Sequence, residues 1–231
     1  LQKNRNKLEI PLHMKNLNIN KKWYNFSDFK HLLFKLKYHF AKNKSKKVSA
    51  SDNTRVWYIL RDYLSERKNI IDSQKYEYDD LNEIENFVYF PLQLEPERTI
   101  LIPAPFYTNQ QEVITNVAKS LPIEYNLVVK EHPMQKVRGW RSLSYYKKIK
   151  DIPNVEFCHP EVSNESIIKK CSLVVTVTGT SGLEAAINGK PSITFADTIY
   201  SELPSVFRVK ELEKLPLIIR EALESKVSIQ D

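Results

Sequence analysis

A strand, a turn of small residues and the start of a helix follow one another within residues 174–186. The turn consists of Thr178, Gly179, Thr180, Ser181 and Gly182, between a β-branched run and a segment rich in Leu, Glu and Ala. The first amides of a helix lack internal acceptors and carry partial positive charge, so this turn predicts a site for an anion such as a phosphate. Many α/β proteins use such glycines only for close packing, and neither a dinucleotide fingerprint nor a P-loop is present.

A second polar group follows another apolar strand, residues 126–131, where His132 precedes Pro133. An imidazole at that position can donate a hydrogen bond to a phosphate oxygen, and Lys130 adds positive charge if it faces the same way. A His-Pro dipeptide at a strand end is also a common loop feature. We therefore predict a phosphate contact because the glycine turn is its neighbour in the fold.

Three carboxylates are candidates for roles in chemistry or in binding. Glu95 and Glu97 flank Pro96 just beyond a strand, and are candidates for acid/base catalysis or for holding a sugar. Glu184 lies in the first turn of the predicted helix, where it can cap the helix or accept hydrogen bonds from a ribose diol. For the pair around Pro96 the alternative is a solvated turn.

The elements that position these groups alternate regularly after residue 86. Strands are predicted at 87–93, 126–131, 155–158, 173–178, 192–196 and 206–209, and helices at 108–120, 143–150, 163–171, 181–188 and 211–224. Strands separated by helices of this length imply a parallel sheet with helices on both faces, so the fold class is α/β and Rossmann-like. Ligands of such sheets bind beyond the carboxyl ends of the strands, where all the candidate groups lie.

The positive charge is concentrated at one end of the chain. The net charge is +7, but residues 1–50 alone contain 13 Lys or Arg against two acidic residues, a charge of +11. Helices are predicted from Asp28 to Phe40, with an apolar face, and over residues 54–66. We therefore divide the chain into a basic helical extension, residues 1–85, and an α/β domain, residues 86–231.

The composition indicates where the protein acts and which kinds of partner it can bind. Two cysteines, Cys158 and Cys171, form neither a disulfide framework nor a metal-ligand spacing, which is typical of the cytoplasm. No apolar run is long enough for a membrane span, whereas the basic helix can pack on a partner domain or lie on an anionic membrane surface. No nucleic-acid recognition motif is present. Because the chain begins at Leu1, we expect a piece of a longer protein.

As an ordered set, these motifs resemble the bacterial capsule and surface polysaccharide biosynthesis family. The resemblance rests on residues 90–97 (FPLQLEPE), 129–133 (VKEHP), 153–155 (PNV), 177–185 (VTGTSGLEA) and 189–191 (GKP), and it covers roughly residues 87–209. Members of that family look like GT-B glycosyltransferases, some of which transfer Kdo from CMP-Kdo. Gln93 and Glu95 stand where the family pattern has His and Gln.

The resemblance implies a nucleotide-sugar donor bound by the α/β domain, which would be one half of a GT-B fold. His132 and the turn at Gly179, Thr180, Ser181 and Gly182 would then contact the phosphate, with Glu184 near the nucleotide. It also implies a transferase that needs no metal and no cofactor besides the donor, and the sequence has no DxD pair beside the site. The acceptor would be a glycan or glycolipid, at the inner face of the membrane.

Two other functions remain open at this level. One is a nucleotide-sugar epimerase of similar two-domain architecture, which binds a UDP-sugar but no acceptor. The other is a non-catalytic domain of polysaccharide assembly or export, which binds no nucleotide.

Overall fold

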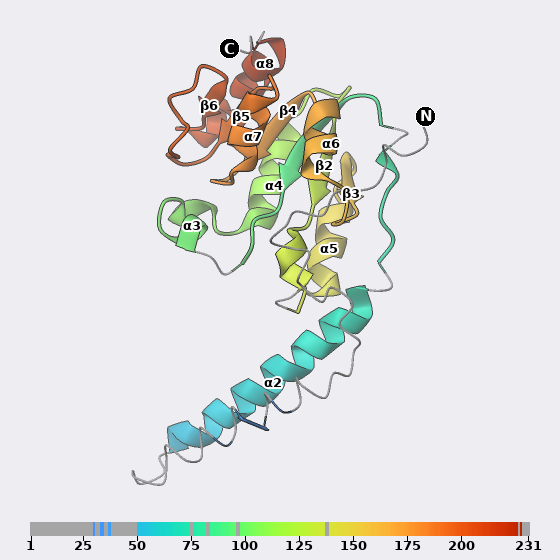
Figure 1. Ribbon diagram of the computed structural model, residues 1–231, viewed down its shortest axis with the longest axis vertical. Helices are drawn as coiled ribbons and strands as arrows, with labels where there is room; N and C mark the ends of the chain where they lie inside the picture. The colour runs from blue at the N-terminus through green and yellow to red at the C-terminus, as the bar shows by residue number, and fades with distance from the viewer. Residues whose placement is uncertain are drawn as a thin grey trace, which may run out of the picture. The chain divides into compact units, whose positions relative to one another are not determined.

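The chain forms an α/β sheet domain and a long separate helix. The computed structural model describes residues 30, 33, 34, 37, 50–73, 76–81, 84–95, 98–136, 139–225 and 227. The strands are β1 (Phe87–Pro91), β2 (Asn126–Lys130), β3 (Val155–Cys158), β4 (Leu173–Thr176), β5 (Ser192–Thr194) and β6 (Val206–Arg208). The helices are α2 (Ala50–Ser73), α3 (Arg98–Leu101), α4 (Gln110–Ser120), α5 (Leu143–Lys150), α6 (Asn164–Lys170), α7 (Ser181–Ile187) and α8 (Leu215–Glu224), with short 3-10 turns that include η2 (Pro105–Tyr107) and η3 (Pro133–Lys136) (Figure 1).

The six strands form one sheet in the order β3-β2-β1-β4-β5-β6, and every pair is parallel. β2 and β3 lie on one side of β1, and β4, β5 and β6 lie on the other. The connections therefore change direction between β1 and β4, which defines the switch point at which open α/β sheets bind ligands. This topology confirms the predicted Rossmann-like fold.

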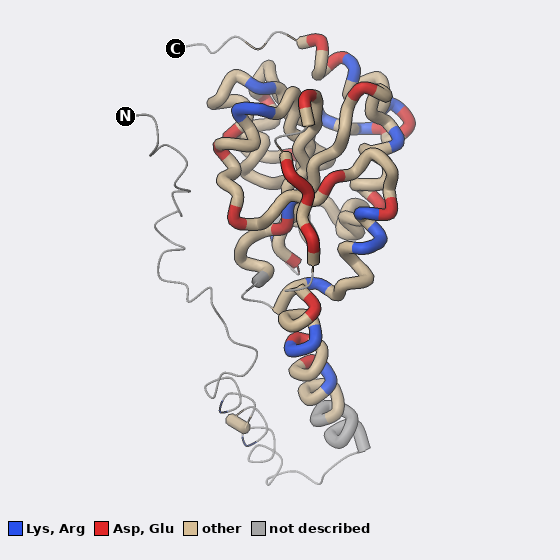
Figure 2. The backbone as a smooth tube through the Cα atoms, turned by 90° about the vertical axis from the view of Figure 1, so that its right-hand side faces the viewer, with Lys and Arg blue, Asp and Glu red and all other residues tan. Residues whose placement is uncertain are grey.

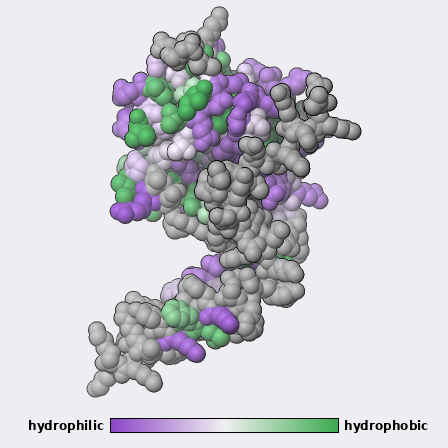
Figure 3. Space-filling model, viewed as in Figure 1, coloured by the Kyte–Doolittle hydropathy of each residue, from purple (hydrophilic) through white to green (hydrophobic). Residues whose placement is uncertain are grey.

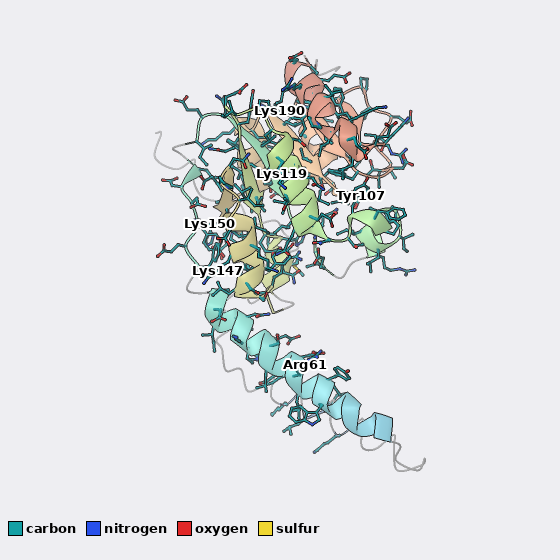
Figure 4. The ribbon with its side chains drawn as sticks, turned by 180° about the vertical axis from the view of Figure 1, so that it is seen from behind. Arg61, Tyr107, Lys119, Lys147, Lys150 and Lys190 are labelled. Atoms are coloured by element: carbon teal, nitrogen blue, oxygen red, sulfur yellow. The ribbon has the colours of Figure 1, made fainter. Side chains whose placement is uncertain are left out.

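Each face of the sheet buries apolar side chains against helices. On one face, Tyr89, Val128 and Val174 pack against Ile168 of α6 and Ala185 of α7, and all five are fully buried. α4, α5 and α8 cover the other face, where α4 packs beside α8 and the Gln111 side chain of α4 donates to the Tyr145 carbonyl of α5 (3.0 Å). Figure 4 shows that face, with Lys119 on α4 and Lys147 and Lys150 on α5. Strands buried on both sides explain the continuous apolar runs in the sequence.

The outer edge of β3 is covered by the chain that leads into the sheet. The Asp79 N–H donates to the Phe157 carbonyl (3.1 Å), and the Phe157 N–H donates to the Asp79 carboxylate (2.8 Å). Lys150 also pairs with Asp79 at 2.5 Å. Partial burial acts to raise the pKa of Asp79, but the bonds from Lys150 and Phe157 hold it below its usual value. An edge strand covered in this way cannot template pairing with another chain.

The contacts divide the chain into two compact units. One contains the sheet, with the described parts of residues 77–135 and 144–231, and the other contains α2 and residues 136–143. Within the second unit the Asn69 side chain donates to the Trp140 carbonyl (3.3 Å), and Gly139 and Trp140 both have positive φ. Basic and acidic residues are interspersed along α2 (Figure 2). Among the helices in the described ranges, none has both the length and the apolar content that crossing a bilayer requires.

Most predicted elements are present, with shorter strands and some differences among the helices. The predicted helix at 54–66 is part of a longer one, α2, and the last helix begins with a separate 3-10 turn before α8. The helix α3 was not predicted. Gly189, with φ 68°, ends α7 as its position predicts, because the Lys190 N–H reaches back to the Ala185 carbonyl (2.9 Å). Most of the predicted basic helix at 28–40 lies outside the described residues; Lys30, Leu33, Phe34 and Lys37 are helical and exposed.

Candidate functional site

The centre of the candidate site is a glutamine that connects the two strands at the switch point. Gln93 follows β1, and its side-chain amide donates to the Thr178 hydroxyl beyond β4 (3.1 Å). In return the Thr178 N–H donates to the Gln93 side-chain oxygen (3.4 Å). The carboxyl ends of β1 and β4 are thus joined by side-chain bonds where a ligand of this fold is expected.

A second glutamine fixes the chain around Glu95. Gln110, the first residue of α4, is 1% exposed and accepts from the Gln93 N–H (2.7 Å) while donating to the Gln93 carbonyl (3.0 Å). The same amide donates to the Glu95 carboxylate, and the Glu95 N–H donates to the Gln135 side chain (3.3 Å). The carboxylate of Glu95 therefore has a fixed orientation at the end of β1. Glu97, the second predicted carboxylate, lies outside the described residues.

The glycine turn after β4 is held by its neighbours. The Gly179 N–H donates to the Thr176 hydroxyl (3.0 Å), the Gly182 N–H donates to the Gly179 carbonyl (3.2 Å), and the Tyr200 hydroxyl donates to the same carbonyl. Tyr200 is 6% exposed, and its ring packs directly on Gly182. Any side chain at position 182 would collide with this ring. Within the part of the chain that the structure describes, the Thr180 and Ser181 amides donate to no other group. Two N–H donors of this turn are therefore available to an anion.

His132 has a defined tautomer. Its Nδ1 accepts a hydrogen bond from the Met134 N–H (3.1 Å), so in the neutral ring the proton lies on Nε2, which is then a donor. Pro133 begins the 3-10 turn η3, which holds this arrangement. The His132 N–H donates to Glu131 (2.7 Å), a fully buried carboxylate that also accepts from the Tyr146 hydroxyl (2.8 Å).

His132 and the glycine turn lie at the same edge of the sheet. His132 follows β2 and Ser181 follows β4, and these two strands are on either side of β1. Since neighbouring strands are about 4.8 Å apart, the two strand ends are separated by about 10 Å. The sequence prediction that both loops meet one edge agrees with this topology, and the spacing fits a phosphate-containing ligand above β1. The binding roles themselves stay predictions.

Lys130 is engaged within the protein. Lys130 is 3% exposed, and its ammonium donates to the Val162 carbonyl (2.7 Å) and to the Asn164 side chain. The same Asn164 oxygen also accepts from the Tyr89 hydroxyl (3.0 Å). Burial lowers the pKa of Lys130 to about 8, although the nearby Cys158 and Glu184 act in the opposite direction. Lys130 therefore ties β2 to the start of α6, and its contact with a phosphate remains a prediction.

Glu184 lies in the first turn of α7, as predicted. The Thr180 hydroxyl donates a long side-chain hydrogen bond to its carboxylate (3.5 Å), and the side chain of Thr180 makes no capping bond to the helix backbone. Its negative charge also acts on Lys130 and Tyr200. Capping and ribose binding both remain compatible with this position.

Sequence reasoning missed two residues that build the site, Gln110 and Tyr200, and it placed Gln93 at a strand end without giving it a role. Gln93 had a signal, since it stands at a strand end. Gln110 and Tyr200 had none, because their partners are distant in the sequence. Among the residues that the structure describes, no three His, Cys, Asp or Glu side chains are grouped to hold a metal ion, and metal independence stays a prediction.

The family is established by comparison with known sequences. The sequence profile of the family described as "Capsule polysaccharide biosynthesis protein" matches residues 7–204. The chain belongs to this family. This capsule polysaccharide biosynthesis chain is also 30% identical to Protein FixF of Sinorhizobium fredii over 134 residues, which are 56% of the chain and 31% of FixF.

Solved structures with a similar fold include two kinds of enzyme. One is KpsC of Thermosulfurimonas dismutans, a beta Kdo 2,7 transferase, with a TM-score of 0.45 and 16% sequence identity. The matched region covers 80% of this chain and 57% of the KpsC chain. The other is the UDP-GlcNAc 2-epimerase of Methanocaldococcus jannaschii in complex with UDP-GlcNAc and UDP, with a TM-score of 0.46 and 17% sequence identity. The matched region covers 71% of this chain and 47% of the epimerase chain. The family member described here therefore spans about a third of FixF and just over half of KpsC.

Proposed function

We propose that this chain is the donor-binding part of a glycosyltransferase of capsular or surface polysaccharide biosynthesis. The proposal rests on family membership and on one structural observation: His132 and the glycine turn lie at the same sheet edge, on either side of the β1 end that Gln93 ties to Thr178. A nucleotide sugar fits this arrangement because it presents both a phosphate and a sugar.

The phosphate is bound by donors from two loops. The donors we assign to the phosphate are the amides of Thr180 and Ser181, which follow β4, and the Nε2–H of His132, which follows β2. Lys130 acts through its positive charge, since its ammonium donates to Val162 and Asn164. Gly179 and Gly182 allow the turn to pack closely against Gln93 and Tyr200, which positions its amides. Pro133 begins the turn that holds the His132 loop, and Glu184 accepts from the ribose. These donors stabilise the negative charge that develops on the leaving phosphate, which is the role that a metal ion has in other transferases.

Glu95 is the first choice for the group that handles the proton. In the transfer, an acceptor hydroxyl oxygen forms a bond to the anomeric carbon, and the bond from that carbon to the phosphate oxygen breaks, with its electron pair going to the phosphate. The hydroxyl proton passes to a base. The Glu95 carboxylate is fixed by Gln110 at the end of β1, so it is preorganised for this step. Glu97 stays the alternative.

CMP-Kdo is the donor to test first, because the motif set resembles a family that includes Kdo transferases. The acceptor is a glycan or glycolipid, and the 13 basic residues among the first 50 favour a position at the cytoplasmic face of an anionic membrane.

The test is calorimetric titration of the chain with CMP, UDP and GDP, using two matched histidine variants. His159 follows β3 in the same kind of turn, since its Nδ1 accepts from the Glu161 N–H (3.2 Å). We expect at least one nucleotide to bind, His132→Ala to weaken it about tenfold or more, and His159→Ala to leave it unchanged, because a hydrogen bond to a charged group contributes about 1.5–3 kcal/mol. Absence of binding by the unmodified chain, or equal losses in both variants, would refute the proposal.

A further inference from the structure

A buried carboxylate directly precedes His132, and the function proposed above gives it no role. Glu131 follows β2 and is 0% exposed, and among the side chains that the structure describes no other Asp or Glu is buried. Figure 3 shows hydrophilic side chains on the surface of the sheet domain, where charged groups stay hydrated. Burying a carboxylate is costly unless hydrogen bonds replace the lost water, so its oxygens need specific donors.

Each oxygen of Glu131 accepts a bond from a different part of the chain. One accepts from the His132 N–H (2.7 Å), and the other accepts from the Tyr146 hydroxyl on α5 (2.8 Å). Tyr146 is 3% exposed, and its ring packs against that of Phe157 on β3, with the centroids 5.2 Å apart. Because this ring is held in the core, its hydroxyl fixes the carboxylate, and the carboxylate fixes the His132 N–H.

The His132 N–H is one of three fixed points on this residue. The Gln135 N–H donates to the His132 carbonyl (2.8 Å), and the Met134 N–H donates to its Nδ1 (3.1 Å). The bond to Glu131 fixes the backbone where the turn η3 begins, and that turn brings the Met134 N–H to the ring. The direction of Nε2, the proposed phosphate donor, therefore depends on Glu131 through the backbone.

The charge of Glu131 argues against a direct contact with the anion. A carboxylate repels a phosphate at close range, and the repulsion is stronger in a buried site, where the effective dielectric constant is low. Both of its oxygens already accept bonds from the protein. A contribution of Glu131 to phosphate binding is therefore indirect and passes through His132.

We propose that Glu131, held by Tyr146, is a positioning residue that orients His132 toward the phosphate of the donor. This inference rests on the proposed function, in which His132 contacts that phosphate. Glu131 acts by geometry and not by charge, since an amide of the same shape can accept from the His132 N–H while it donates to the Tyr146 oxygen. Displacing a binding group by about 1 Å is enough to remove much of its contribution.

The first test is calorimetric titration with whichever of CMP, UDP and GDP binds best. Glu131→Leu should weaken binding about threefold to tenfold, and no more than His132→Ala does, because it acts through that residue. Glu131→Gln should retain the affinity within about twofold, and Tyr146→Phe should lie between these two variants. The matched control is Tyr145→Phe, the same change at the neighbouring position of α5, which should leave the affinity unchanged.

A double variant separates positioning from general damage to the fold. In the His132→Ala background, Glu131→Leu should cause no further loss of affinity, because the group that it positions is already absent. A loss of equal size in both backgrounds would overturn the inference. So would a full loss of affinity in Glu131→Gln, because the effect would then belong to the charge.

Nuclear magnetic resonance of the histidine ring nitrogens tests the inference without a ligand. At about pH 8.5, where imidazoles are mostly neutral, His132 of the unmodified chain should show one tautomer, with the proton on Nε2. Glu131→Leu, or Tyr146→Phe if the leucine variant does not fold, should give a mixture of tautomers at His132. His159 is the internal control and should not change, since its Nδ1 accepts from the Glu161 N–H in a turn of its own.

The two readouts distinguish this inference from the proposed function. An unchanged His132 tautomer in these variants would overturn the positioning role, whatever the nucleotide affinity. If the unmodified chain binds no nucleotide but the tautomer responds as expected, the proposed function fails and the orienting role of Glu131 stands.

Discussion

Substituting Gly182 by Ala should destabilise the protein, although the same change usually stabilises a helix. A Cβ on Gly182 would lie 2.8 Å from both Cε2 and the hydroxyl oxygen of Tyr200. The tyrosine cannot move away freely, because it is 6% exposed and its hydroxyl bonds to the Gly179 carbonyl. The ring must shift, and the bond that fixes the glycine turn is weakened or lost.

The magnitude follows from two opposing effects. Overpacking of this kind costs about 1–3 kcal/mol, and loss of the hydrogen bond adds about 1 kcal/mol. Replacing Gly by Ala in a helix contributes about 0.5–1 kcal/mol in the other direction. The net loss in the free energy of unfolding is therefore about 1–3 kcal/mol. In a Tyr200→Leu background the clash is absent, so Gly182→Ala should become neutral or stabilising by about 0.5–1 kcal/mol.

The assay is a double-mutant cycle. Urea unfolding followed by circular dichroism gives the free energy of unfolding for the unmodified chain, the two single variants and the double variant. We expect a coupling energy of about 2 kcal/mol between the two sites. The reasoning is refuted if Gly182→Ala costs the same in both backgrounds, or if it stabilises the protein that retains Tyr200.

Three further outcomes concern the polar contacts that hold the site and the sheet edge. Gln110→Leu should lower the free energy of unfolding by about 2–4 kcal/mol, because it leaves the buried N–H and carbonyl of Gln93 unpaired. The control, Gln111→Leu, should lower it by about 1 kcal/mol or less. Equal losses for the two variants in urea unfolding would contradict this prediction. Lys130 has a folded pKa of about 8, below its unfolded value, so the unfolded chain binds more protons and stability should rise between about pH 8 and pH 10.5. The free energy of unfolding of the unmodified chain should therefore rise by about 3 kcal/mol relative to that of Lys130→Met over this pH range. If the difference between the two proteins stays constant from pH 8 to pH 10.5, the folded pKa of Lys130 is not lowered. Asp79→Ala should lower the free energy of unfolding by about 1–2 kcal/mol at pH 7, where the carboxylate is ionised. Because the pKa of Asp79 is lowered in the folded protein, this loss should become smaller as the pH falls below about 4. A loss that does not change with pH would show that the ionised carboxylate contributes nothing to stability.

The fold could be predicted because its signals are local. Each central strand is a continuous apolar run between turn residues, and strands that alternate with helices leave a parallel sheet as the simple solution. Gly189 marked the end of α7 for a similar reason, since its positive φ is a property of one residue. The short helix α3 was missed because its four residues are too few to show a helical period.

The candidate site was predictable only in part. The loops were found, because each follows a strand, and the parallel topology places all of them at one edge. The residues that fix those loops were not found. Gln110 bonds to Gln93 across 17 positions and Tyr200 bonds to Gly179 across 21, and no local pattern marks such partners.

The sequence by itself determined which residues stand at the strand ends, because alternation of strands and helices depends on the periodicity of nearby side chains. It also determined that His132 and Ser181 share one edge, since parallel strands all end on the same side. Only the tertiary structure decided which side chains are committed to the protein itself. Lys130 appeared available for a ligand, yet its ammonium is buried against Val162 and Asn164. Such commitments depend on contacts between distant segments, which exist only after the chain has folded.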